Sequence, residues 1–323
     1  MTRNMRGKLA ATVSAAALCA AALVPPSSAA SVPETSCRVF PADNVWHLDV
    51  RGLPVHPKND VWKRSAHAAS TSLHPDFGPP AYGIPFDVVG SAFPKIRVRF
   101  RHASESDAGP YPLNGSTPVE GGSDRHALVI DRSDCRLYEL YAVRWNGGRP
   151  TAGSGAIFRL EGPRANDLRP AGWTSADAAG LPIFPGLVRH DEVAEGRIDH
   201  AIRFTVDCTT DRYAWPARHE AGVSDRRCPP MGARFRLKSS FSLAAFGPAA
   251  QTVLRAMKRY GLMLADNGSD WYFQGTVDRR WTNGLMDQLK SVPAKAFQAV
   301  DVSACRVSRH SAAFSYGPGC PAP

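Results

Sequence analysis

Short runs of alternating apolar and polar residues, separated by glycine and proline, constrain the fold of this chain more than any other feature. In residues 95–100, Ile96, Val98 and Phe100 fall on one face by a period of two. The opposite face carries three arginines, Arg97, Arg99 and Arg101. Further runs predict strands at residues 125–131, 136–143, 155–160, 199–206 and 233–238.

Helical signals are few and short. One clear helix is predicted to begin at Pro248 and to end at Gly261, with apolar residues at helical spacing between them. Two shorter helices are expected near residues 60–69 and 284–290, and the Asn-Gly pair after Asp266 predicts a hairpin turn between two strands. This pattern favours a mainly β fold, a single β-sandwich or jelly-roll-like domain with a few peripheral helices. The alternative is an α+β domain with the Pro248 helix at its centre.

The first thirty residues have the features of a secretory signal peptide. A basic start is followed by an uncharged apolar run over residues 9–24 and by small residues before Ser31. We therefore expect residues 1–30 to be a signal peptide and residues 31–95 to be an extended segment that wraps the core. Residues 96–323 are expected to form a β-rich core domain, and the protein is expected to be secreted and extracellular.

Six cysteines follow the predicted signal peptide, an even number that implies disulfides in an oxidising compartment. Proximity along the chain favours Cys208–Cys228 and Cys305–Cys320, which leaves Cys37 to pair with Cys135. A free catalytic thiol is not expected.

Charge and missing motifs narrow the function. Residues 31–323 hold 36 Lys and Arg against 29 Asp and Glu, a net charge of +7, which suits contact with acidic polysaccharide as well as it suits solubility. The sequence lacks GxSxG, HExxH, P-loop and GxGxxG motifs. We expect a monomer that acts on polysaccharide without metal or cofactor, and we expect neither nucleic-acid binding nor membrane insertion.

Four residues are predicted to be catalytic. Asp124 and His126 share a face at the start of a strand, after a glycine-rich loop, and a carboxylate beside an imidazole raises its basicity. Asp177 lies in a small-residue loop, where burial would favour a general acid. Glu139 is a substitute for Asp124 as the second carboxylate. The plain alternatives are an ordinary strand start in which Asp124 caps a turn, and a short helix that Asp177 N-caps.

Aromatic, cationic and amide side chains are predicted to bind substrate. Aromatic rings stack on sugar faces, arginines hold hydroxyls or acidic sugars, and planar polar groups take up adjacent hydroxyls. The residues assigned to this group are Trp173, Arg189, His200, Arg218, Asp266, Asn267, Trp271 and Tyr272.

Several motifs resemble a widespread, largely uncharacterised family of secreted bacterial proteins. The resemblance covers over half of the expected mature chain and implies an exported protein with a shared fold, but it implies no activity. The motifs are DRHALVID at residues 124–131, LYELY at 137–141, RPAGWTSADAAGLPIFPGLVRH at 169–190, PPMGARFRLK at 229–238 and KRYGLMLADN at 258–267.

The leading hypothesis is a secreted glycoside hydrolase that uses a pair of carboxylates on an extracellular polysaccharide. One alternative is a non-catalytic glycan- or wall-binding protein, for which aromatic and cationic side chains would suffice. The other is a polysaccharide lyase on an acidic glycan, in which His126 or His200 would remove a proton.

Overall fold

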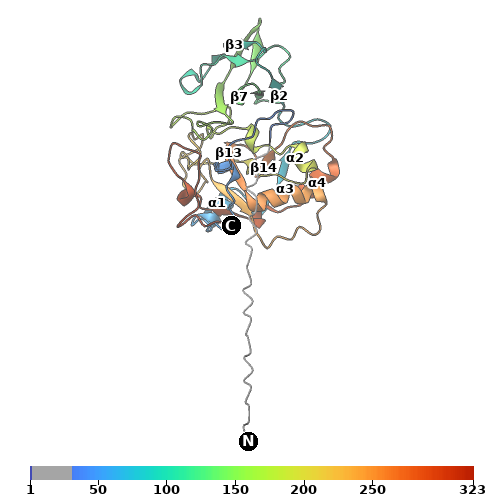
Figure 1. The fold of residues 1–323 in the computed structure, drawn as a ribbon, viewed down its shortest axis with the longest axis vertical. Helices are drawn as coiled ribbons and strands as arrows, with labels where there is room; N and C mark the ends of the chain where they lie inside the picture. Colours follow the sequence, from blue (N-terminus) through green and yellow to red (C-terminus); the bar gives the residue numbers. More distant parts are fainter. Residues whose placement is uncertain (2–30) are drawn as a thin grey trace.

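The fold is mainly β, with 28% of residues in strands against 16% in helices. A computed structural model describes Met1 and residues 31–323, so the predicted signal peptide lies, apart from Met1, outside the described residues. The predicted mainly β class with few helices is confirmed. Figure 1 shows a smaller lobe with strand β3 above a larger lobe that holds strands β13 and β14 and helices α3 and α4.

A mixed six-stranded sheet forms the larger lobe. In spatial order its strands are β1 (His74–Asp76), β14 (Tyr272–Gln274), β11 (Ile202–Val206), β13 (Leu262–Asn267), β12 (Arg234–Leu237) and β15 (Phe297–Val300). All five residues of β11 are buried, as expected for a strand covered on both faces.

Four α-helices are found in the described part of the chain. They are α1 (Asn59–Ser65), α2 (His190–Ala194), α3 (Pro248–Arg259) and α4 (Asn283–Lys290). Helix α3 begins at Pro248, where the missing amide costs no hydrogen bond, and its apolar face is buried in the main core. Five short 3₁₀ segments occupy Val45–His47, Ala103–Glu105, Phe184–Gly186, Ala294–Ala296 and Ser303–Cys305.

A four-stranded sheet joins the two lobes. Its order is β10 (Ser154–Arg159), β7 (Arg136–Tyr141), β6 (Ala127–Asp131) and β2 (Phe86–Val89). Leu128, Ile130 and Leu137 belong to the main core, whereas Val129 and Tyr138 belong to a second apolar cluster in the smaller lobe. The sheet is therefore packed on both faces, and its side chains of one parity point toward the larger lobe.

Two small sheets complete the smaller lobe. One pairs β3 (Lys95–Ile96) with β5 (Tyr111–Pro112). The other contains β4 (Arg99–Phe100), β9 (Arg149–Ala152) and β8 (Arg144–Asn146), with β9 in the middle. The run predicted as one strand over residues 95–100 is thus divided between β3 and β4. The segment 31–95 contributes β1 and β2, which are edge strands of the two larger sheets.

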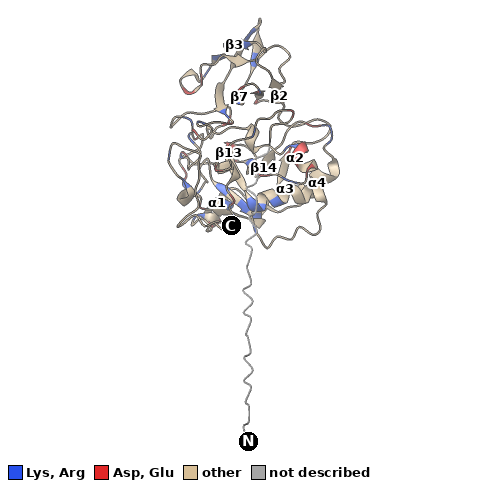
Figure 2. Ribbon diagram, viewed as in Figure 1, with Lys and Arg blue, Asp and Glu red and all other residues tan. Residues whose placement is uncertain are grey.

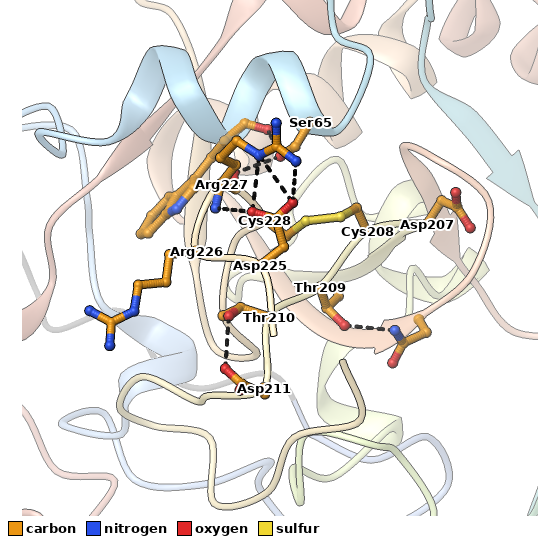
Figure 3. The surroundings of a disulfide bond; sticks show 12 residues. Ser65, Asp207, Cys208, Thr209, Thr210, Asp211, Asp225, Arg226, Arg227 and Cys228 are labelled. Atoms are coloured by element: carbon orange, nitrogen blue, oxygen red, sulfur yellow. Dashed lines mark hydrogen bonds and ion pairs between the residues drawn. A yellow bond between two sulfur atoms is a disulfide. The ribbon is translucent and has the colours of Figure 1, made fainter. Parts of the chain in front are cut away.

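Three disulfides are formed, and all three predicted pairings are confirmed: Cys37–Cys135, Cys208–Cys228 and Cys305–Cys320. Figure 3 shows the second of these, which ties the segment after β11 to the loop before β12. Such bonds are typical of proteins in oxidising compartments. In residues 31–323 no helix is both long and apolar enough to cross a membrane.

The predicted Asn-Gly hairpin is wrong. Strand β11 lies between β13 and β14, so the two strands that flank Asn267 and Gly268 do not pair with each other. The Gly268 amide donates to the carbonyl of Val206, and the Trp271 amide donates to that of Thr205. The connection therefore crosses the end of β11, because long-range pairing outweighs the local turn preference.

Candidate active site

An open polar cleft of about 700 Å³ lies where the two lobes meet. The smaller-lobe side supplies His102, Asp124, Tyr141 and Ser154. The larger-lobe side supplies the loop around Asp177 together with His219, Asp266 and Asn267. Three predicted site carboxylates, Asp124, Asp177 and Asp266, thus line one cavity, although they are far apart in the sequence.

Asp177 is held by a buried arginine of β11. The Nε and Nη2 atoms of Arg203 donate to its two carboxylate oxygens at 2.8 and 2.6 Å, and both side chains are almost completely buried. The loop that presents Asp177 turns tightly: the Ser175 hydroxyl lies 2.9 Å from the Asp177 amide and 2.6 Å from the Leu181 carbonyl. Gly180 has φ +68°, and a Cβ there would lie 2.5 Å from the Trp173 carbonyl, so this turn requires glycine.

Asp266 reaches the same arginine because β13 contains an irregularity. Residue Phe204 pairs with Leu264, but the next residue, Thr205, pairs with Asp266. The extra residue in β13 shifts by one the alternation of its side chains between the two faces of the sheet. Asp266 therefore lies on the same face as Thr205 and Arg203. One oxygen of Asp266 lies 3.9 Å from Nη2 of Arg203.

The surroundings of Asp266 favour the protonated form of its carboxyl group. Burial, the nearby charge of Asp177 and a side-chain hydrogen bond between the two carboxyl groups raise the pKa of Asp266 well above its usual range. Arg203, which donates to both oxygens of Asp177, opposes this shift but does not outweigh it. The Asp266 side chain keeps 26% exposure and lines the cleft.

His126 joins the two lobes rather than lining the cleft. Its Nδ1 lies 2.5 Å from Oε2 of Glu120, and its Nε2 lies 3.2 Å from the carbonyl of Ala176. Burial opposes the imidazolium charge, but Glu120 raises the pKa of His126 above its usual value. Burial likewise opposes the carboxylate charge, yet His126 lowers the pKa of Glu120. The pair therefore fixes the loop that carries Asp177.

Glu139 is completely buried where β7 meets the larger lobe. Its carboxylate accepts hydrogen bonds from the amides of Ile183, at 2.8 Å, and Phe184, at 2.8 Å. Burial raises its pKa to about 7, although these two amide donors oppose the shift. Glu139 thus supports the segment after the Asp177 loop and does not line the cleft.

Stability should fall with rising pH because of Glu139. The pKa of this carboxyl group is about 7 in the folded state and near 4.5 in the unfolded state. Below pH 4.5 the group is protonated in both states, so it does not lower the free energy of unfolding. As the pH rises, the unfolded state loses this proton first, and above pH 7 the free energy of unfolding is lower by about 3 kcal/mol. We expect Glu139→Gln to remove this part of the pH dependence. Denaturant unfolding at pH 4.5 and pH 7.5 should show the stability of the wild type, relative to the variant, falling by that amount. An unchanged difference would contradict the assignment.

The predicted cationic and imidazole ligands lie elsewhere. Arg189 and His200 are buried on either side of Glu192, at 2.6 and 3.2 Å from its oxygens. Arg218 is buried and donates to the carbonyls of Arg169 and Arg309. All three side chains have contacts within the protein, and none of them lines the cleft.

The three predicted aromatic platforms do not line the cleft either. Trp271 is completely buried in the core, with 0% of its surface exposed to solvent, and its indole donates to the carbonyl of Ala66. Tyr272 stacks on His74 with ring centroids 4.0 Å apart. Trp173 is half-buried, with the guanidinium of Arg169 5.4 Å from its ring. The aromatic ring found in the cleft is that of Tyr141.

The sequence analysis missed Arg203, Glu120, Tyr141 and His219 as parts of this region. A recognisable signal existed for Arg203, which lies between two apolar residues of a strand that is buried on both faces. An arginine in such a position needs a buried acid as its partner. His219 lines the cleft with its Nδ1 bound to the carbonyl of Ala178.

The comparisons with known proteins assign no chemistry to this site. No protein family model, no curated protein and no solved structure matches the chain. Among Met1 and residues 31–323, no group of three or more His, Cys, Asp or Glu side chains is arranged to hold a metal ion. The function therefore has to be inferred from the side chains of the cleft, and the resemblance to secreted bacterial proteins stays a prediction.

Proposed function

We propose that the protein is a secreted glycoside hydrolase in which Asp266 is the general acid and Asp124 is the second carboxylate. The observation that carries this proposal is the carboxyl group of Asp266, which lines an open polar cleft and whose pKa is raised by burial and by the nearby Asp177. A carboxyl group that stays protonated above its usual range is what protonation of a leaving oxygen requires.

This assignment changes the role predicted for Asp177. Two carboxyl groups within hydrogen-bonding distance of each other are too close to act across one glycosidic bond, which needs a separation of about 5–9.5 Å. Asp177 and Asp266 are such a close pair. We therefore assign Asp177 to positioning, and the catalytic partner of Asp266 to Asp124, which lines the same cleft from the smaller-lobe side.

In the proposed reaction, Asp266 gives its proton to the glycosidic oxygen as the bond from that oxygen to the anomeric carbon breaks. Water supplies the oxygen that bonds to that carbon, and Asp124 takes the proton that this water loses. Asp266 is left as a carboxylate, and its new charge is offset by Arg203, whose Nη2 is 3.9 Å away.

The other walls of the cleft suit a sugar chain. Hydroxyl, amide and imidazole groups of Tyr141, Ser154, Thr174, Asn267 and His219 line it, and such groups exchange hydrogen bonds with sugar hydroxyls. The three disulfides and the net positive charge support the proposed export and an extracellular polysaccharide as partner.

The two other hypotheses have less support from the site. A lyase would need a free base, but both ring nitrogens of His126 and of His200 already have partners within the protein. A glycan-binding module would rely on aromatic platforms, and Trp173, Trp271 and Tyr272 lie outside the cleft lining.

The test is to incubate the purified mature protein with a panel of neutral and acidic polysaccharides, measuring reducing ends and unsaturated products together. We expect new reducing ends without unsaturated products on at least one substrate. Unsaturated products would replace the hydrolase with a lyase. Retention of a polysaccharide without any turnover would replace it with a binding protein.

A further inference from the structure

A second hollow, about 280 Å³ in volume, opens on the smaller lobe. Three arginines line it, Arg99, Arg101 and Arg144, and we call it the arginine groove. Figure 2 shows Lys and Arg positions along the strands of this lobe. None of the other groove-lining residues is acidic: they are Phe100, Ala142, Thr151, Ala152 and Gly153.

Strand register brings the three arginines to one side of the small sheet. Thr151 of the central strand β9 pairs with Arg99 of β4 on one flank and with Arg144 of β8 on the other. Neighbouring strands are about 4.8 Å apart, so the two arginine backbones are roughly 10 Å apart on the same face. Arg101 follows Arg99 by two residues and therefore shares that face.

These three charges are not compensated. Elsewhere on the surface, exposed arginines pair with an aspartate two residues away, as Arg227 does with Asp225 and Arg280 with Asp278. Within residues 31–323, Arg99, Arg101 and Arg144 take part in no ion pair with a carboxylate. A face that serves solubility alone mixes both signs of charge, so a hollow whose charged lining residues are all arginines indicates an anionic ligand.

The arginine groove adjoins the proposed catalytic cleft. Arg101, Ala142 and Gly153 line the groove, and a residue adjacent to each in the sequence lines the cleft: His102, Tyr141 and Ser154. Gly153 allows this close contact, because a Cβ there would lie 2.5 Å from the Tyr141 ring. One extended ligand can therefore occupy both hollows.

We propose that the arginine groove binds the anionic groups of an acidic polysaccharide whose scissile bond lies in the adjoining cleft. This inference rests on the proposed hydrolase function for the cleft and adds the class of substrate. Guanidinium groups bind carboxylates and sulfates through paired hydrogen bonds. Asp124 and Glu105 line the cleft and disfavour an anionic group there. The anionic groups of the polysaccharide are therefore assigned to the groove.

The test compares two variants with equal loss of charge. Arg99→Gln with Arg144→Gln removes two groove cations, whereas Arg212→Gln with Arg226→Gln removes two exposed cations outside the groove. Fluorescence polarisation would measure binding of labelled oligogalacturonate, sulfated dextran and neutral dextran at low salt. We expect the groove variant to bind the anionic probes about tenfold more weakly, about 1.4 kcal/mol, with the control variant unchanged.

The two probes separate the sources of the anionic group. Weaker binding of oligogalacturonate alone assigns carboxylates, and weaker binding of sulfated dextran alone assigns sulfates. The groove proposal would be overturned if the groove variant and the control variant lost affinity for the anionic probes equally. It would also be overturned if the wild type bound neither anionic probe. Because binding is measured without turnover, groove-dependent binding by a protein that cleaves no polysaccharide would refute the hydrolase and leave the anion site standing.

Discussion

Replacing Asp266 with asparagine is expected to lower kcat about 10³-fold on any polysaccharide that the protein cleaves. Removal of a general acid has an effect of this order. An amide has the shape of the carboxyl group and can donate the same hydrogen bond to Asp177, but it cannot give a proton to a leaving oxygen. The fold and the substrate KM should therefore be conserved, and steady-state kinetics with a thermal melt would check both.

The pH profile gives a second measurement of the same role. The active form is the protonated one, and the pKa of Asp266 is raised, so activity should fall as pH rises through that raised value. Asp211→Asn, at an exposed aspartate outside the cleft, is the control and should leave activity unchanged. Full activity of the Asp266 variant would remove Asp266 from the mechanism.

Local patterns predicted those parts of the fold in which neighbours in sequence are also neighbours in space. The β6–β7 hairpin pairs Asp131 with Arg136 across a short turn, and helix α3 begins at its proline, both as predicted. The Asn-Gly turn failed because β11 enters the sheet between its flanking strands. Nothing within residues 262–274 encodes that insertion, which depends on pairing with residues some sixty positions away.

The site was predicted in part for the same reason. Asp124 lies in a glycine-rich loop before β6 and Asp177 in a loop of small residues, whereas Asp266 lies near the end of β13. Trp271 was misplaced because an indole in a turn sequence has no periodicity that shows its burial. Arg203 was overlooked although it organises the site, because its two acidic partners come from other segments of the chain.

The two lobes are joined beside the cleft by polar contacts on either side of the Asp177 loop. His126 contacts the carbonyl of Ala176, and Glu139 accepts from the amide of Ile183. Both residues belong to or adjoin the four-stranded sheet, whereas the loop belongs to the larger lobe. The position of Asp177 relative to Asp124 therefore depends on buried charges rather than on apolar packing alone. Among these buried charges, the ion pair of Asp177 with Arg203 is expected to affect stability most when one partner is removed.

Breaking that pair from one side should destabilise the protein strongly. Arg203→Met leaves Asp177 without its cation, and Asp177→Leu leaves Arg203 with only Asp266 at 3.9 Å. Each single change is expected to lower the free energy of unfolding by about 3–5 kcal/mol, because an uncompensated charge remains buried. The double variant removes both charges, so it should be no less stable than either single variant.

The exposed pair of Arg227 and Asp225 provides a matched control. It has the same two-pronged geometry, with Nε and Nη2 of the arginine on the two oxygens of the aspartate, as Figure 3 shows. Water replaces the missing partner at that position, so the equivalent single changes should have little effect. Urea unfolding of both sets gives the two coupling energies. Additive losses in the buried set would mean that Arg203 and Asp177 do not act as a unit.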